Sequence, residues 1–326
     1  MEEKEMQVTG EVRRKKVSVM VPTYNEEENV VPLSEAIIAQ FQSEALSKYD
    51  YEIVFIDNCS TDRTRPLLRE LCAGNPNIKA IFNARNFGQF NSPYWGICQT
   101  TGDCTLAMCA DFQDPVEMIP TLIGKWEEGY RVVCAVKTAS KENKLVRFLR
   151  TCYYKLIRKF SDVEQIEHFT GFGLYDRSFV DVLRGVEDSS PFLRGIIAEL
   201  GFAKVEVPYE QQKRRAGKTH NNFGTLYDAA MLSFTSYTKT PLRFFHFLGW
   251  FLLAASVLGG AACLVLGLLD FKIGYTWLAP VIGFFASLNM ISLGMLGEYV
   301  LLLRSKINKR PLVIEECRLN FDGETK

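Results

Sequence analysis

The stretch that decides the fold reads C-T-L-A-M-C-A-D-F-Q-D from Cys104 to Asp114, and Pro115 follows it. Its apolar first half is typical of a buried strand, whereas its second half brings Asp111, Gln113 and Asp114 together. In an open α/β sheet, ligands bind just outside the carboxyl ends of the strands. Oxygen side chains gathered there can hold a hard divalent cation, which in turn binds phosphate oxygens. For this stretch taken alone, a strand that ends in a solvated turn with Asp as a helix cap is the plainer alternative.

Strand and helix patterns alternate over the first part of the chain. Apolar and β-branched runs predict strands at 17–21, 51–56, 78–82, 105–110 and 131–136. Apolar residues at helical spacing predict helices over 26–46, from about Thr64, and after Pro115. This order predicts an α/β fold with a mostly parallel sheet and helices on both faces.

Three of the predicted strands end in polar clusters. The first strand leads into P-T-Y-N-E-E-E-N (22–29), the second into D-N-C-S-T-D-R-T (57–64), and the fourth into Asp111 and its neighbours. The carboxyl ends of parallel strands meet at one edge of a sheet, so we expect the three clusters to converge. Carboxylates that lie close together repel one another unless a cation joins them. Capping accounts for Asp62 or Thr64, but hardly for all three clusters.

Composition excludes several classes of function. The 326 residues include 38 basic and 38 acidic side chains, so net charge offers no argument for a nucleic-acid partner. The nine cysteines lack C-x-x-C spacing and are read as reduced thiols. Neither a G-x-G-x-x-G nor a P-loop motif is present, and the three histidines fit neither a zinc site nor a nucleophilic triad. Metal-assisted chemistry on a phosphorylated substrate is the class that remains.

Two long apolar runs near the C-terminus predict membrane-spanning helices. Residues 244–269 and 275–303 are 26 and 29 residues long, and each holds one ionisable side chain, His246 and Glu298. Each run exceeds the roughly 20 residues needed to cross a bilayer. Basic residues flank the pair on the outside, whereas Asp270 and Lys272 lie between them. The positive-inside rule then predicts both termini and the large domain in the cytoplasm, and the N-terminal stretch shows no signal peptide.

The remaining segments complete the expected organisation. Residues 145–160 read as a basic amphipathic helix, which suits either an anionic membrane surface or ordinary packing on the sheet. Residues 222–238 form a second amphipathic pattern that runs into the first apolar run. We therefore expect an N-terminal extension (1–16), a cytoplasmic catalytic domain (17–221), a juxtamembrane amphipathic helix (222–242), two transmembrane helices (243–304) and a cytoplasmic tail (305–326).

The motifs in this order resemble those of a known family. V-P-T-Y-N-E-E-E-N-V, F-I-D-N-C-S-T-D-R-T, A-R-N-F-G-Q and A-D-F-Q-D-P are similar to successive motifs of the family-two GT-A glycosyltransferases. The later T-G-F-G-L-Y-D-R, V-P-Y-E and K-R-R-A-G-K-T, followed by the two apolar runs, narrow the resemblance to the polyprenyl-phosphate glycosyltransferases. That group contains bactoprenol glucosyltransferases and dolichol-phosphate mannose synthases. The resemblance covers Val17 to Pro311 and implies a GT-A fold, that of nucleotide-diphospho-sugar transferases.

The resemblance also implies roles for individual residues. The nucleotide sugar would be bound by residues in all three clusters and in the later basic stretch: Pro22, Tyr24, Glu26, Asp57, Asp111 and Arg214. Asp111 and Gln113 match metal ligands for Mg²⁺ or Mn²⁺. Arg214, with Gly217 and Thr219, matches the stretch that closes over the diphosphate and acceptor, and Lys137 and Arg147 match basic residues for the lipid phosphate. The expected catalytic set is Asp111, Asp114, Arg214, Arg147 and Lys137.

Three positions depart from the family pattern. Cys109 replaces the first Asp of D-x-D, so metal affinity depends on Asp114 or water as a substitute ligand. Asn58 follows Asp57 in place of a second Asp. Gly171 stands where an acidic residue is often found, which leaves no evident general base. A polyprenyl phosphate is already an anion near neutral pH and can attack the anomeric carbon directly, and the resemblance implies a single displacement with inversion.

The sequence therefore predicts a membrane enzyme that moves a hexose, in first place glucose from UDP-glucose, onto undecaprenyl phosphate at the inner face of a bacterial membrane. GDP-mannose is the alternative donor. A processive polysaccharide synthase would need a Q-x-x-R-W stretch and more spans, and this chain has neither. A non-catalytic scaffold that partners a flippase is the alternative from another class, and self-association through the hairpin is left open.

Overall fold

The computed structural model describes residues 13–139, 166, 169–186, 188, 191–216 and 311–321, together with scattered positions between 278 and 303. The chain divides into two compact units. The first consists of Met1–Lys141, Ile166–His220 and Arg310–Lys326, and the second of Glu142–Gln165 and Asn221–Lys309. The sheet and the candidate site described below belong to the first unit.

The first unit is built on a sheet with the strand order β7-β5-β6-β4-β1-β2-β3-β8. The strands are β1 (Lys16–Thr23), β2 (Asp50–Asp57), β3 (Ile78–Asn83), β4 (Cys104–Ala107), β5 (Val132–Ala139), β6 (Phe169–Asp176), β7 (Lys204–Glu210) and β8 (Glu315–Leu319). β1 pairs in parallel with β2 and β4, β2 with β3, and β5 with β7. β6 and β8 run antiparallel to their neighbours, so the mostly parallel sheet predicted from the sequence is confirmed.

Helices cover both faces of this sheet, as the alternating pattern predicts. They are α1 (Val30–Gln42), α2 (Thr64–Gly74), α3 (Gly88–Gln99), the 3₁₀ helix η1 (Val116–Met118), α4 (Ile119–Glu127), α6 (Arg177–Gly185) and α7 (Leu193–Leu200). Val19 and Val21 of β1 pack into the core that α1, α2 and α4 share, whereas Met20 packs into the core of α3, α6 and α7. Successive strand residues point to opposite faces, so an apolar run such as β1 supplies both cores.

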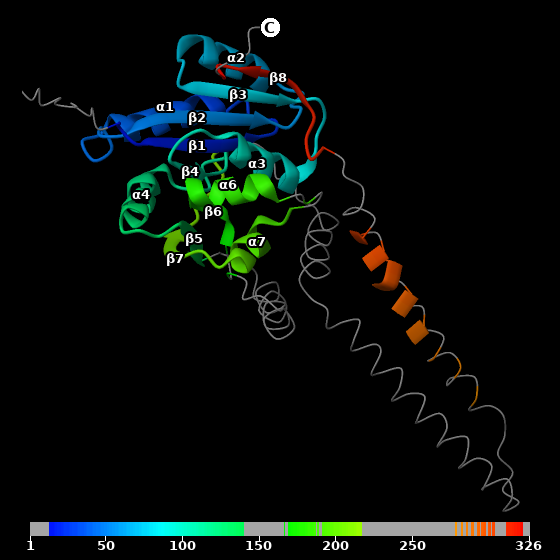
Figure 1. Cartoon of the computed structure of the whole chain (residues 1–326). Coiled ribbons are helices and arrows are strands. Elements are labelled where there is room, and N and C mark those ends of the chain that lie inside the picture. Colours follow the sequence, from blue (N-terminus) through cyan, green and yellow to red (C-terminus); the bar gives the residue numbers. More distant parts are fainter. Residues whose placement is uncertain are drawn as a thin grey trace, which may run out of the picture. The chain divides into compact units, whose positions relative to one another are not determined.

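Six elements have no counterpart among the strands and helices predicted from the sequence, namely α3, β6, α6, α7, β7 and β8. No element is predicted at residues 88–99, yet α3 forms there with Pro93 in its interior. Residues 305–326 are predicted to be a tail, whereas β8 in this segment pairs antiparallel with β3 at the edge of the sheet (Figure 1). The charged E-E-C-R-L sequence of β8 is compatible with an edge strand, but it lacks the apolar pattern from which a strand would be predicted.

The membrane prediction concerns the second unit. Among the described positions, we find no helix with the length and apolarity that crossing a bilayer requires. The amphipathic patterns at 145–160 and 222–238 and the first apolar run lie outside the described residues. In the second run, described helical positions expose apolar side chains, with Ile282, Leu293 and Val300 each more than half exposed. The hairpin and the domain boundaries therefore stay predictions.

Candidate functional site

The loops after β1 and β2 are joined by hydrogen bonds at the carboxyl edge of the sheet. The amide of Asn25 donates to Ser60 Oγ (2.9 Å) and that of Glu26 donates to Thr64 Oγ1 (2.8 Å). In return, the amide of Thr61 donates to Asn25 Oδ1 (2.8 Å). Residues of the first two predicted clusters are thus held against each other by short polar side chains.

Some of the hydrogen bonds between these loops serve to hold the start of α2 in place. Asp62 accepts hydrogen bonds from the amides of Glu27 (3.2 Å) and Thr64 (3.0 Å), and the amide of Arg63 donates to the Glu27 carboxylate (2.9 Å). These contacts occupy both oxygens of Asp62 at the start of α2. The N-cap residue of α2 is Arg63, and no side chain caps the helix, so Asp62 and Thr64 serve mainly to hold the first two loops together.

Each of the three loops contains a residue with left-handed backbone. Asn25 after β1, Cys59 after β2 and Phe112 after β4 have φ angles of 57°, 64° and 59°. Asn adopts this region readily, whereas Cys and Phe do so at a cost of about 1–2 kcal/mol. Strained residues of this kind gather at functional sites, and here all three lie at the edge where the polar clusters converge.

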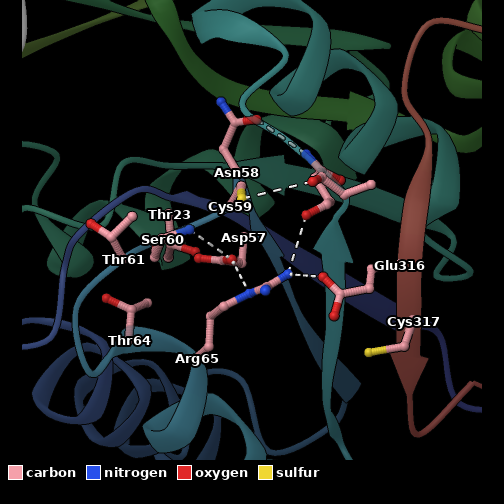
Figure 2. Close-up of polar contacts among 12 residues, drawn as sticks. Thr23, Asp57, Asn58, Cys59, Ser60, Thr61, Thr64, Arg65, Glu316 and Cys317 are labelled. Carbon is pink, nitrogen blue, oxygen red and sulfur yellow. Dashed lines mark hydrogen bonds and ion pairs between the residues drawn. The ribbon is translucent and has the colours of Figure 1, made fainter.

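Asp57 ends β2 as a fully buried carboxylate (Figure 2). Its Oδ2 accepts hydrogen bonds from Arg65 Nε (2.9 Å) and from the amide of Ser60 (3.1 Å). None of the described residues donates to its Oδ1. Burial raises the pKa of Asp57, and the bonds from Ser60 and Arg65 oppose that rise. A buried carboxylate with one free oxygen is costly for the fold and well suited to a ligand that brings an N–H donor.

The departure at Asn58 has a structural reason. Its Nδ2 donates to Asn86 Oδ1 (2.9 Å) and to the carbonyl of Gly88 (3.2 Å). Its Oδ1 accepts from Asn83 Nδ2 (3.2 Å) and from the amide of Phe87 (2.8 Å). An aspartate could not make the first two bonds, because it has no N–H group. Asn58 therefore holds the A-R-N-F-G-Q loop beside the end of β2.

Asn58→Asp is expected to lower stability by about 1 kcal/mol, because Asn86 Oδ1 and the carbonyl of Gly88 lose their donor and face a carboxylate instead. Circular dichroism melting of the detergent-purified protein measures the effect. Asn77→Asp serves as the matched control, since Asn77 is exposed. Equal melting temperatures for Asn58→Asp and the unaltered protein would contradict the role assigned to this amide.

Asp111 forms an ion pair with Arg214, one of the basic residues named by the resemblance. Arg214 Nε and Nη2 lie 3.0 Å and 2.8 Å from Asp111 Oδ2. Two backbone hydrogen bonds hold these segments together. The amide of Arg215 donates to the carbonyl of Asp111 (3.2 Å), and the amide of Gln212 donates to the carbonyl of Gln113 (3.2 Å). The segment after β7 therefore packs against the loop after β4, and the guanidinium of Arg214 contacts the carboxylate of Asp111 there.

Glu26 links this pair to the first loop. Burial raises its pKa, while a hydrogen bond from Asn29 Nδ2 (2.6 Å) and the charge of Arg214 oppose the rise. The charge of Asp111 also acts on Glu26, in the direction of a higher pKa. The charges of Asp111 and Arg214 both act on Glu26, in keeping with the predicted convergence of the first and third clusters.

Asp114 has a different environment from Asp111. It is buried, and its two oxygens accept hydrogen bonds from the amide of Cys109 (2.9 Å) and from Tyr209 OH (3.0 Å). Burial raises the pKa of Asp114, and these bonds oppose the rise. Asp114 thus ties the end of β4 to β7, and both oxygens are engaged by the fold. If Asp114 contributes to catalysis as predicted, it would do so by holding the loop after β4 in position.

The remaining predicted residues are placed as follows. Pro22 lies in β1 opposite Ile56, Tyr24 follows β1, and Lys137 is a half-buried residue of β5. Arg147, Gly217 and Thr219 lie outside the described residues. Gly171 has a φ of 102°, which an acidic side chain would adopt only with strain, so glycine suits the backbone there. Arg65 was missed, because nothing in α2 distinguishes it from a surface arginine.

The side chains allow a limited test of the predicted metal. In the part of the chain that the structure describes, no three His, Cys, Asp or Glu residues are grouped to hold an ion. Asp111 could serve as a ligand when Arg214 turns to another anion, whereas Asp114 is engaged by the fold. Mg²⁺ is commonly bound by one or two carboxylates together with substrate phosphates and water. The residues therefore fit an ion that arrives with a diphosphate, not a protein-only cage.

Comparison with known proteins defines the class. Residues 18–184 match the family described as "Glycosyl transferase family 2". The chain belongs to this family and is a glycosyltransferase, as the motifs predict.

Individual relatives are similar over nearly the whole chain. The bactoprenol glucosyl transferase of Shigella phage SfX is 31% identical over 93% of this chain and 99% of its own length. The prophage bactoprenol glucosyl transferase homolog of Escherichia coli (strain K12) is 32% identical over 92% of this chain and 98% of its own length. A solved mannosyltransferase from Pyrobaculum calidifontis is 18% identical, covers 92% of this chain and 89% of its own, and has a TM-score of 0.42.

Proposed function

We propose that the protein transfers glucose from UDP-glucose to a polyprenyl phosphate, undecaprenyl phosphate in bacteria, at the cytoplasmic face of the inner membrane. The observation that carries the proposal is the Asp111–Arg214 pair at the carboxyl edge of the sheet. Such a pair can take up a diphosphate, with the guanidinium on the phosphate oxygens and the carboxylate on an accompanying cation. Relatives named bactoprenol glucosyl transferase support the choice of sugar and lipid.

The residues would act mainly by position and charge. Asp57 and Glu26 face the nucleoside, Arg214 turns to the diphosphate, and Lys137 and Arg147 take the lipid phosphate. An oxygen of the lipid phosphate attacks the anomeric carbon, and the bond to UDP breaks with its electron pair on the departing diphosphate. The attacking oxygen carries no proton, so no general base is required, and the configuration inverts. A Mg²⁺ or Mn²⁺ ion at Asp111, with Gln113, would stabilise the charge of the leaving group.

The membrane location is part of the proposal. Two apolar runs of 26 and 29 residues, with basic residues on their outer flanks, support a helical hairpin that leaves the catalytic unit in the cytoplasm. Described helical positions in the second run expose Ile282, Leu293 and Val300, side chains suited to lipid contact. An acceptor with a phosphate headgroup and a polyprenyl chain would reach the site from the cytoplasmic leaflet of the membrane.

The test uses the full chain purified in detergent with undecaprenyl phosphate and Mn²⁺. We expect release of UDP from UDP-glucose that depends on the lipid, glucose in the lipid fraction, and loss of both on addition of EDTA. A parallel reaction with GDP-mannose tests the alternative donor. If no nucleotide sugar is cleaved in the presence of the lipid, the proposal is wrong and a non-catalytic membrane role gains support.

A further inference from the structure

Arg65 lies at the junction of three strands (Figure 2). From α2 its side chain, 21% exposed, donates through Nε to Asp57 Oδ2 (2.9 Å). Its Nη2 donates both to the carbonyl of Asn83 at the end of β3 (3.1 Å) and to Glu316 Oε2 on β8 (2.8 Å). One guanidinium thus joins β2, β3 and β8 beside the candidate nucleoside site.

The chemistry of this junction requires an arginine. The guanidinium is planar, carries donors in a rigid fork and stays charged, whereas a lysine presents one compact ammonium. The fork also lies over the ring of Phe82, 5.2 Å from its centroid, which limits its rotation. Arg65 can therefore hold a buried carboxylate in one orientation while it contacts two further strands.

Asp57 is the group that this orientation affects. With Oδ2 taken by Arg65 and Ser60, and Oδ1 without a donor among the described residues, the carboxylate has one oxygen left for a ligand. The two oxygens are chemically equivalent, so what the bond from Arg65 can fix is the plane of the carboxylate and the direction in which its second oxygen points.

Strand β8 supplies the other end of the junction, and it is firmly attached. Trp95 Nε1 and Arg318 both donate to Glu315, and Arg318 Nη2 donates to Gln99 Oε1 (2.9 Å), which ties β8 to α3. Asn320 Nδ2 donates to the carbonyls of Cys72 (2.7 Å) and Ile78 (2.8 Å). Glu316 is therefore presented to Arg65 by a fixed strand, although 251 positions separate the two residues.

We propose that Arg65, held by Glu316 of the C-terminal strand, is a positioning residue that sets the Asp57 carboxylate to receive the nucleoside of the sugar donor. This inference rests on the proposed function and adds that β8 is part of the nucleotide site. It assigns no contact between Arg65 and the substrate. Arg65 acts through Asp57, and Glu316 acts through Arg65.

The experiment uses the full-length protein in detergent, with KM measured separately for UDP-glucose and undecaprenyl phosphate, and Kd measured for UDP. Glu316→Gln is the safest variant, because the Glu316 side chain is about half exposed. We expect it to raise KM for UDP-glucose about three-fold, in keeping with a partly exposed ion pair, and to leave KM for the lipid unchanged. Glu70→Gln, an exposed carboxylate on α2, is the matched control and is expected to change neither.

Arg65→Ala is expected to raise KM for UDP-glucose about thirty-fold, since a buried carboxylate loses its charged partner. Burial would then raise the pKa of Asp57 without opposition from Arg65, so KM for UDP-glucose should fall as pH rises. Arg65→Lys should recover part of the loss. In the Arg65→Ala background, Glu316→Gln should have no further effect, because its partner is gone.

Several outcomes would overturn the inference. Unchanged KM for UDP-glucose in Glu316→Gln and in Arg65→Lys, with full turnover and melting temperature, would show that the junction does not position Asp57. Equal increases in KM for both substrates would assign it a purely structural role. If Arg65→Ala does not fold, Glu316→Gln and Arg65→Lys decide the question. Absence of UDP binding and transfer in the unaltered protein would remove the proposed function and this inference together.

Discussion

Replacing Asp111 by alanine is expected to reduce glycosyl transfer by about a thousand-fold or more while the protein remains folded. Asp111 is the carboxylate that faces Arg214 at the carboxyl edge, and both are assigned to the diphosphate of the donor. Removal of one preorganised charge from a site where charge develops in the transition state costs about a hundred- to a thousand-fold, and loss of the metal ligand adds to it. The measurement is lipid-dependent release of UDP from UDP-glucose.

Asp111→Asn and Glu117→Gln complete this series. Asp111→Asn preserves shape and removes charge, so we expect it to be nearly as inactive as the alanine variant. Glu117 lies six positions away in η1 and is exposed, so Glu117→Gln should retain full activity. Melting temperatures check that each variant is folded. Full activity of Asp111→Ala, or of the unaltered protein in EDTA, would refute the role given to this carboxylate.

Replacing Glu52 by glutamine is expected to lower stability by about 3 kcal/mol at neutral pH. Glu52 of β2 is 1% exposed and lies 2.9 Å from the ammonium groups of both Lys16 and Lys79. It also accepts hydrogen bonds from Ser18 Oγ (2.6 Å) and the amide of Thr101 (2.6 Å). Glutamine would leave the largely buried Lys79 without its counter-charge, and breaking such a pair from one side is strongly destabilising.

The same carboxylate predicts how stability depends on pH. Burial alone would raise the pKa of Glu52, but the bonds from Lys79, Ser18, Thr101 and Lys16 outweigh it and lower the pKa to about 2. In the unfolded chain the pKa is near its ordinary value of 4.5. The contribution of Glu52 is therefore fully present above pH 4.5 and is lost as the pH falls from 4.5 towards 2.

Thermal melting in detergent between pH 7 and pH 2.5 measures both effects. We expect Glu52→Gln to melt about 10 °C lower at pH 7, and the gap to the unaltered protein to narrow below pH 4.5. Glu70→Gln is the control at every pH. A gap that stays constant down to pH 2.5 would contradict the ionic origin of the effect, and no gap at pH 7 would contradict the role of Glu52 itself.

Much of the fold could be predicted because its signals are local. The strands that became β1, β2, β3 and β5 are short apolar runs bounded by polar residues, and parallel strands in a covered sheet are buried on both faces. The first strand was predicted at 17–21 and extends over Lys16–Thr23. The polar clusters at 22–29, 57–64 and 111–114 were predicted to converge because parallel strands present their carboxyl ends at one edge.

Two of the elements that were missed, α3 and β8, lack a local signal. β8 consists of five mostly polar residues, and only its pairing with β3 makes it a strand. Pro93 lies in the interior of α3, which packs Tyr94 and Ile97 against the sheet. Packing of apolar side chains outweighs a poor helix propensity, so propensity alone misleads in this segment.

The amino-acid order was enough to establish the class of protein, the α/β architecture and the polar edge that would bind substrate, because periodicity and strand-end chemistry extend over only a few neighbouring residues. The three-dimensional fold alone revealed which of those polar groups meet which partner. Asp111 and Arg214 are 103 positions apart, and Arg65 and Glu316 are 251 apart. Partners this distant are chosen by the packing of whole strands and helices against one another. No pattern within a single segment encodes that choice.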